Sequence, residues 1–152
     1  MKITKATKEH CKEISLLMKR DLDNSPKEFS QEFLIKFREH AEEKNILEEF
    51  NNPLTIGLIA MINEKIVGFI VGYVVNSEHA MIHYINGETK EIKKSLLQEF
   101  IIACKNKNMK YILADSFEFM ENDEVLKKRG FNLCNKEKIN ETLIMLWRRL
   151  EL

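Results

Sequence analysis

The chain has 152 residues, of which 24 are Lys or Arg and 24 are Asp or Glu, so its formal net charge is zero. This length suits one domain with its own core, and we expect residues 1–152 to form a single domain. Zero net charge argues against nucleic acid and membranes as partners, because proteins that bind them usually carry a basic excess. No apolar run reaches the roughly 18 residues of a membrane span, and residues 1–5 lack the apolar stretch of a signal peptide, so we expect a cytoplasmic protein.

The cysteines and histidines predict no disulfide framework and no metal site. Cys11, Cys104 and Cys134 are odd in number, far apart and never in a Cys-x-x-Cys pair. His79 and His83 share a face of an expected strand, but a third ligand is missing from the pattern. We therefore expect no bound metal.

The N-terminal region predicts a short strand and a helix. Residues 1–5 alternate weakly, which favours an edge strand. Thr7 is suited to cap a helix whose apolar residues Cys11, Ile14 and Met18 lie on one face.

A second helical section is marked by Ser25-Pro26-Lys27-Glu28, a capping box with proline at the first helical position. It is expected to end before Pro53. Its stripe of Phe29, Phe33 and Phe37 suits either core packing or the lining of an apolar acceptor site.

The remaining chain alternates strands with two helices. A hairpin around Asn63-Glu64-Lys65 joins the first two strands. One helix follows Gly87-Glu88-Thr89 and stops at 106–108, and a shorter one, capped by Asn122 or Asp123, ends at Arg129 before Gly130. The expected strands cover 54–62, 66–75, 80–85, 111–117, 131–134 and 142–150.

This order, β-α-α-β-β-β-α-β-α-β-β, predicts an α/β (α+β) fold with a mixed, mostly antiparallel central sheet and helices on both faces. The segment 80–117 is expected to form a strand–helix–strand crossover with parallel strands. Three stretches then resemble the GCN5-related N-acetyltransferase (GNAT) superfamily: the hairpin from Leu54, the strand–loop–helix from Met81 to Lys107, and the run from Glu121 to Gly130-Phe131.

The resemblance implies a pyrophosphate site for acetyl-CoA at a helix N-terminus, where free N–H groups favour an anion. The family's loop usually has the pattern Arg/Gln-x-x-Gly-x-Gly/Ala, but the matching residues here are Glu88, Glu91 and Lys93. Lysines at the start of the helix are candidates to compensate. The cofactor-binding residues implied are Tyr84, Ile85, Thr89, Lys90, Glu91, Ile92, Lys93, Lys94 and Ser116.

The transfer also needs an unprotonated amine and a proton for the departing thiolate. His83 is the first candidate for the general base, since its ordinary pKa lies near neutrality, and Glu78 is the second. The family's tyrosine acid falls on Leu126, which has no proton to give. Tyr84 and Tyr111 are the alternatives by position, although both suit packing in a sheet.

Two functions are consistent with these residues. One is an N-acyltransferase that moves an acetyl group from acetyl-CoA to the amine of a small molecule or peptide by direct transfer. The other is a non-catalytic binding module that kept the fold and lost the cofactor loop. A homodimer paired through residues 142–150 is a further option, although the alternation there is equally satisfied within one chain.

Overall fold

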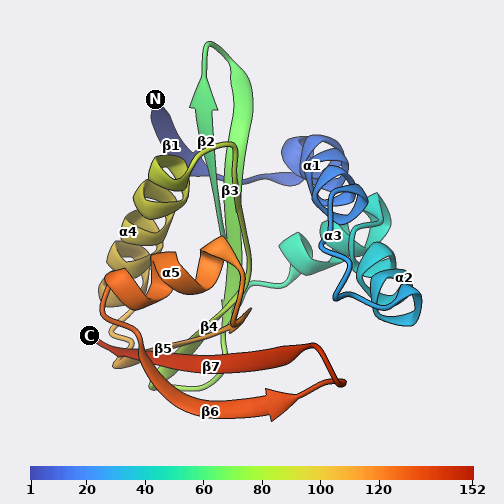
Figure 1. Ribbon diagram of the computed structural model, residues 1–152. Coiled ribbons are helices and arrows are strands. Elements are labelled where there is room, and N and C mark those ends of the chain that lie inside the picture. The colour runs from blue at the N-terminus through green and yellow to red at the C-terminus, as the bar shows by residue number, and fades with distance from the viewer.

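The computed structural model describes residues 1–152 and contains a seven-stranded mixed sheet in the order β1-β2-β3-β4-β5-β7-β6 (Figure 1). Only β4 and β5 pair in parallel, and every other neighbouring pair is antiparallel. The parallel crossover expected over residues 80–117 is therefore confirmed. The strands are β1 Lys2–Lys5, β2 Thr55–Ile62, β3 Lys65–Val74, β4 His79–Gly87, β5 Tyr111–Phe117, β6 Asn132–Lys138 and β7 Ile144–Glu151.

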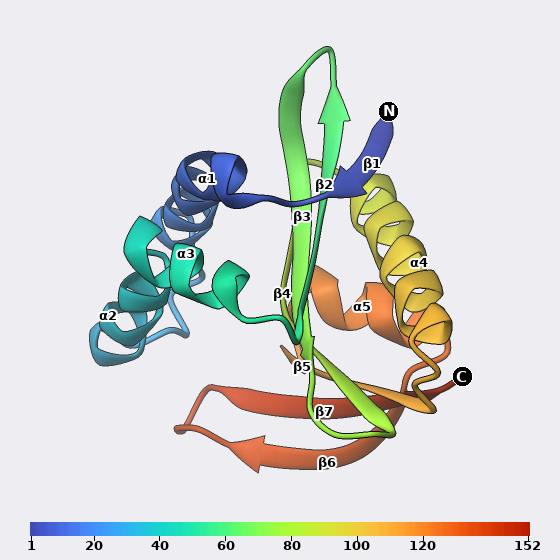
Figure 2. The same cartoon turned by 180° about the vertical axis from the view of Figure 1, so that it is seen from behind.

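Helices cover both faces of this sheet, as the sequence predicts (Figures 1 and 2). None of them is long and apolar enough to cross a membrane. On one face lie the short 3-10 turn η1 Lys8–His10 and the helices α1 Cys11–Asp23, α2 Gln31–His40 and α3 Glu43–Asn51; on the other lie α4 Lys90–Asn106 and α5 Glu121–Lys128.

Two apolar cores result from this layering. Eighteen buried residues lie between the sheet and α4 and α5, with Phe100 fully buried among them. Eleven buried residues lie between the sheet, α1 and α3, with Phe69 fully buried. The sheet is thus packed against apolar side chains on both faces.

The helical section after residue 25 differs from the prediction. Ser25-Pro26 does not begin a helix; α2 starts at Gln31, and the Ser30 hydroxyl caps it by accepting the Phe33 N–H at 3.1 Å. The section then divides into α2 and α3 at Ala41, which is fully buried. Two capping serines compete in this segment, and the sequence pattern favoured the wrong one.

The end of the chain also differs from the prediction. All seven residues of β6 are exposed, so no apolar alternation marked its full length. Strand β7 lies between β5 and β6 and has no free edge. Residues 144–151 therefore offer no free strand edge to a second copy, and a homodimer stays a prediction.

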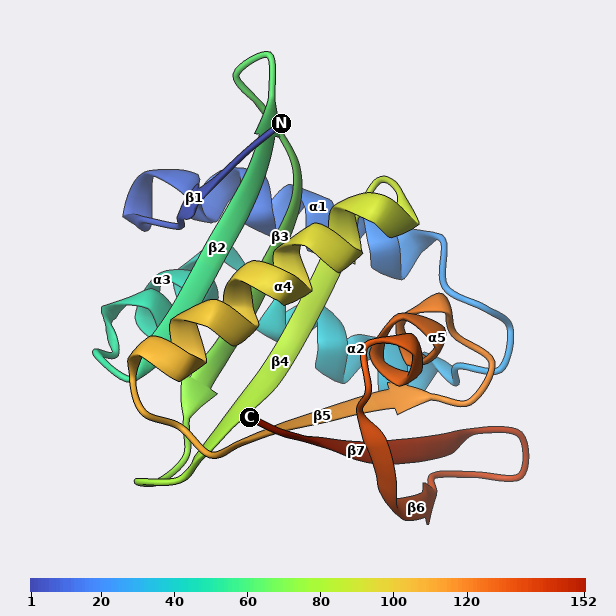
Figure 3. The same cartoon turned by 90° about the vertical axis from the view of Figure 1, so that its left-hand side faces the viewer.

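Two irregularities of β4 prepare the site. Val71 pairs with Tyr84 and Gly72 pairs with Ile82, so His83 is the extra residue of a β-bulge. Strand β4 pairs with β5 only as far as Ile82, opposite Ala114, and beyond that point the strands diverge (Figure 3). The bulge and the gap between the two strands coincide.

Candidate functional site

The opening between β4 and β5, which we call the strand gap, begins at the pair Ile82 and Ala114. His83 and Asp115 are the next residue on each strand. Figure 3 shows α5 lying close to the mouth of this gap. Groups from the two strands, α3 and α5 therefore meet in one region.

His83 is held by a carboxylate from α3. Its Nδ1 lies 2.9 Å from Glu49 Oε1, and the side chains are 38% and 27% exposed. An ionised carboxylate can only accept, so Nδ1 carries the hydrogen and Nε2 of the neutral ring keeps its lone pair. The rings of His40 and Tyr73 lie near His83, with centroids 5.9 and 6.5 Å away. The arrangement orients an imidazole as a proton acceptor.

The acid–base properties of the pair across the gap are shifted. The hydrogen bond that His83 donates to Glu49 raises the pKa of His83 above its ordinary value, with further contributions from the charges of Glu49 and Asp115. Burial raises the pKa of Asp115, and the nearby Glu137 adds to the effect. Perturbed groups gathered in a gap of the sheet are typical of a functional site.

Glu78 is not part of this group. It precedes β4 at the closed end of the strand pair, where its carbonyl accepts N–H groups of Lys110 and Tyr111. Its carboxylate pairs with Lys110 Nζ at 2.8 Å, which lowers the pKa of Glu78 and weakens it as a base. Five residues of strand separate it from His83, roughly 16 Å. The predicted pair of bases is not brought together.

The tyrosines considered as proton donors are engaged elsewhere. The Tyr84 hydroxyl donates to Asp21 of α1 at 3.1 Å, and burial beside that carboxylate raises its pKa. Asn86 donates to the same carboxylate at 2.6 Å. Tyr111 stacks on His79 at the closed end. Leu126 is buried in the core, so no hydroxyl replaces the family's acid there.

The N-terminus of α4 presents three amides with no hydrogen-bond partner in the chain, those of Thr89, Lys90 and Glu91. Thr89 caps the helix by accepting the Ile92 N–H at 3.2 Å. Free amides at a helix N-terminus are the usual site for a phosphate. The side chains of Ile85 and Ile92 are buried in the core, so these two residues offer only backbone groups.

The lysines at this helix start are all paired with carboxylates. Lys90 Nζ lies 2.9 Å from Glu124, and Lys93 Nζ lies 3.7 Å from Glu121, both across to α5. Lys94 pairs with Glu91 on its own helix at 2.8 Å. The lysines predicted to compensate for the missing glycines are thus not free, because glutamates compete with a phosphate for their charges.

Asn122 of α5 reaches into the strand gap. Its Nδ2 donates to the Ile85 carbonyl of β4 at 3.2 Å, while its Oδ1 is buried without a partner. An unpaired buried acceptor costs about 1–3 kcal/mol, and such groups are few in native proteins. This oxygen is an acceptor beside β4 that the chain leaves unpaired.

Ser116 belongs to a buried network beneath the gap and not to its surface. Its hydroxyl donates to Asp123 at 2.8 Å, and Arg148 of β7 donates to both oxygens of that carboxylate, at 2.6 and 3.2 Å. Asp123 and Arg148 are each 8% exposed. This network anchors α5 to β5 and β7 and so fixes the position of Asn122.

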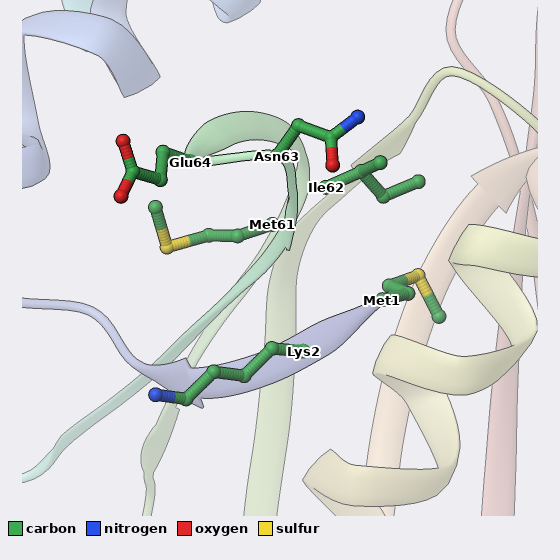
Figure 4. A pocket seen from close by; sticks show the side chains of 6 residues that line it. All are labelled: Met1, Lys2, Met61, Ile62, Asn63 and Glu64. Atoms are coloured by element: carbon green, nitrogen blue, oxygen red, sulfur yellow. The ribbon is translucent and has the colours of Figure 1, made fainter.

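Two pockets lie outside the strand gap. One, of about 450 Å³, is formed by the N-terminus and the β2–β3 turn and includes Met1, Met61 and Glu64 (Figure 4). The other, of about 480 Å³, lies at the start of α5 and is lined by carboxylates such as Glu118 and Glu121. Its negative charge disfavours a phosphate.

The chain has the fold of solved N-acetyltransferase structures over nearly its full length, although no protein-family model and no curated protein matches its sequence. An aminoglycoside 6'-N-acetyltransferase from Enterococcus faecium superimposes with a TM-score of 0.76 at 13% identity, covering 99% of this chain and 97% of the other. A ribosomal-protein-alanine N-acetyltransferase from Brucella melitensis gives 0.77 at 16%, covering all of both chains.

A third neighbour carries the cofactor. The PaiA N-acetyltransferase from Thermoplasma acidophilum, in complex with coenzyme A, gives a TM-score of 0.76 at 18% identity and covers 98% of each chain. The GNAT fold predicted from the sequence is confirmed by these likenesses.

Sequence reasoning missed the groups that complete the site. Glu49 lies 34 residues before His83, and no local pattern links them. Asn122 was assigned only as a helix cap, although α5 begins at Glu121. A carboxylate on an otherwise amphipathic helix gives no signal for a contact with a strand so distant in sequence.

Proposed function

We propose that the protein is an acetyl-CoA-dependent N-acetyltransferase, with residues 1–152 as one catalytic domain, that acts on an amine in the cytoplasm by direct transfer. The observation that carries the proposal is the imidazole of His83, placed by the β4 bulge at the strand gap and oriented by Glu49 at 2.9 Å. The fold shared with N-acetyltransferases supports the reaction class.

Two features of the strand gap and α4 suit coenzyme A. The free amides of Thr89, Lys90 and Glu91 suit its pyrophosphate, and the unpaired Oδ1 of Asn122 suits an amide N–H of its pantetheine arm. The missing loop glycines weigh against tight binding, because side chains replace bare backbone there. Acetyl-CoA, when bound, supplies an acetyl group activated as a thioester.

The residues of this chain then prepare the acceptor. Asp115 faces the gap from β5 and attracts an ammonium ion, while His83 Nε2 accepts one proton from it and leaves the nitrogen lone pair free to act as nucleophile. Glu49 stabilises the imidazolium that forms. His83 is the one base in this step, and Glu78, paired with Lys110 at the closed end of the strand pair, has no part in it.

A non-catalytic binding module is the second candidate function. The pairing of Lys90 with Glu124 and of Lys93 with Glu121 favours it, because these contacts neutralise the lysines nearest the free amides. Such a protein would keep the fold and bind neither coenzyme A nor acetyl-CoA.

Calorimetric titration with coenzyme A and acetyl-CoA separates the two functions. The proposal predicts a dissociation constant in the micromolar range or tighter, and a weaker one in Asn122→Leu, which loses the unpaired oxygen. Asn132→Leu on the exposed strand β6 is the matched control and should bind as the wild type does. Absence of both heat and thermal shift at millimolar coenzyme A would refute the enzyme.

A further inference from the structure

Five phenylalanines gather beside the candidate site, and none of them is buried. Phe29 packs against Phe33, Phe117 and Phe119, with ring centroids 5.2, 5.0 and 6.1 Å apart, and Phe37 lies 4.6 Å from Phe33. Phe119 is 45% exposed, and the other four are intermediate. We call this set the phenylalanine cluster. A contiguous group of five aromatic rings that stays partly exposed is typical of a binding surface.

The helix that supplies part of this cluster is itself unburied. α2 carries Phe33 and Phe37, and none of its ten residues is buried. Leu34 and Phe37 pack against the core on the α1–α3 face while staying partly exposed, and Phe33 belongs to neither core. The fold therefore uses only part of the aromatic stripe of α2, and Phe33 is left free to contact a ligand.

The phenylalanine cluster adjoins the acid–base groups through β5. Asp115 and Phe117 are two residues apart on one strand, so both side chains lie on the same face, roughly 7 Å from each other. Trp147 is paired with Asp115 on β7 and so shares that face. The indole N–H of Trp147 lies 3.4 Å from Glu137. The carboxylates of Asp115 and Glu137 therefore lie a short distance from the phenylalanine cluster.

The charges around His83 favour a cation. Glu49, Asp115 and Glu137 all act on this region, as the shifted pKa values of His83 and Asp115 show. No lysine or arginine contributes to the shifted pKa of His83 or of Asp115. A small molecule with an ammonium group on a short chain would place the ammonium beside these carboxylates and its other end against the phenylalanine cluster.

We infer that the acceptor is a small primary amine joined through a short alkyl chain to an aromatic ring, with its ammonium beside Asp115 and its ring against the phenylalanine cluster. The inference rests on the proposed function for the acetyl transfer, but the binding of the amine can be measured without it. Burial of one ring is expected to strengthen binding roughly tenfold or more over an alkylamine of the same basicity.

The test compares 2-phenylethylamine with propylamine by calorimetry, and by the fluorescence of Trp147, the single tryptophan of the chain. We expect at least tenfold tighter binding of 2-phenylethylamine. Asp115→Asn should weaken it about tenfold while leaving uncharged 2-phenylethanol unaffected, because only the ammonium loses a partner. Glu141→Gln, at the exposed β6–β7 turn, removes the same charge and should change neither.

A substitution in α2 tests the other end of the ligand. Phe33→Ala should remove most of the preference for 2-phenylethylamine over propylamine, with the circular dichroism spectrum unchanged because the residue is not part of either core. If Phe33→Ala also loses its helical signal, the conservative variant Phe33→Leu takes its place in the test. Phe33→Leu should still bind 2-phenylethylamine more than threefold tighter than propylamine. A smaller preference in Phe33→Leu would overturn the inference.

The outcomes separate this inference from the proposed function. Acetylation of propylamine and 2-phenylethylamine with equal affinity would overturn the inference and leave the transferase intact. Selective binding of 2-phenylethylamine with no thiol released from acetyl-CoA would support the binding site and overturn the transferase. The inference would also be overturned if a second copy of the chain covers the phenylalanine cluster. This would be detected as a dimer that dissociates in Phe119→Ser with no change in amine selectivity.

Discussion

Release of the lysines at the start of α4 should strengthen the binding of coenzyme A. Lys90 and Lys93 are held by Glu124 and Glu121 across the helix contact. The double variant Glu121→Gln, Glu124→Gln removes both carboxylates and keeps their size. The freed lysines then lie beside the unpaired amides of α4, where Glu91, itself paired with Lys94, is the remaining carboxylate of the first turn.

The geometry sets the size of this effect. In the wild type, Glu124 also pairs with Lys128 at 2.8 Å, and the two lysines lower the pKa of Glu124 to about 2. Glu124 therefore keeps a cation when Lys90 leaves it, so the wild type already loses little when Lys90 turns to a phosphate. The 3.7 Å between Lys93 and Glu121 marks a weak contact. Exposed pairs of this kind alter an equilibrium constant by only a few-fold each, so we expect affinity to rise roughly fivefold to twentyfold.

Calorimetry at low and high salt checks this prediction. The gain should shrink as salt rises, because the charge of Lys90 is exposed to solvent and screened by ions. The control double variant Glu9→Gln, Glu141→Gln makes the same change in net charge away from α4 and should gain little. Unchanged or weaker binding in the Glu121 and Glu124 variant, or an equal gain in the control, would refute the reasoning.

Three further changes probe the parts that hold the site. Asp123→Asn should cost about 3–5 kcal/mol in the free energy of unfolding, measured with urea, because it leaves the guanidinium of Arg148 buried without its charge partner. Glu49→Gln should move the pH profile of kcat/KM to lower pH, because Glu49 raises the pKa of His83 and the rate needs the neutral ring. Gly72→Ala should destabilise the protein by roughly 1–3 kcal/mol, because the added methyl would lie 2.5 Å from the ring of Phe100 and would also meet backbone of β4.

Each of these has an outcome that contradicts it. The double variant Asp123→Leu, Arg148→Met should recover most of the lost stability; if it does not, charge burial is the wrong cause. A pH profile that stays in place in Glu49→Gln would show that His83 is not the group being titrated. If Gly72→Ala has the melting temperature of the wild type, the backbone at the bulge accommodates the added methyl without loss of stability, which contradicts the prediction.

The pair of Glu49 and His83 also makes stability depend on pH. Folding raises the pKa of His83, so the pair stabilises the protein fully below the unfolded value of about 6.5 and this contribution fades as pH rises through the folded value. Glu49→Gln should therefore cost more stability at pH 5.5 than at pH 8.5. A loss that is equal at both values would contradict this cause.

Local patterns predicted the sheet well and the N-terminal helices less well. The strand from Tyr111 to Phe117 was predicted from a run that looked buried for most of its length, although only alternate residues of it are buried. The left-handed Gly130, with a φ of 102°, follows from the need for glycine after a helix. The start of α2 was missed because Ser25 and Ser30 both offer a hydroxyl to cap a helix, and it is Ser30 that accepts the Phe33 N–H.

The candidate site was harder to predict than the fold. His83 could be chosen from its residue type and its strand, but its partner Glu49 is fixed by the packing of α3 beside β4. The lysines of α4 were visible as a cluster, whereas their glutamate partners on α5 meet them only in three dimensions. Contacts between elements far apart in sequence leave no periodic signal in a single chain.

The most direct test of the account measures amine-dependent thiol release from acetyl-CoA by the wild type and by His83→Ala, with coenzyme A affinity determined on the same preparations. The account predicts release that rises with amine concentration in the wild type and falls at least about 100-fold in the variant, with unchanged coenzyme A affinity. Equal release by both proteins, or none by the wild type at saturating acetyl-CoA and amine, would contradict it.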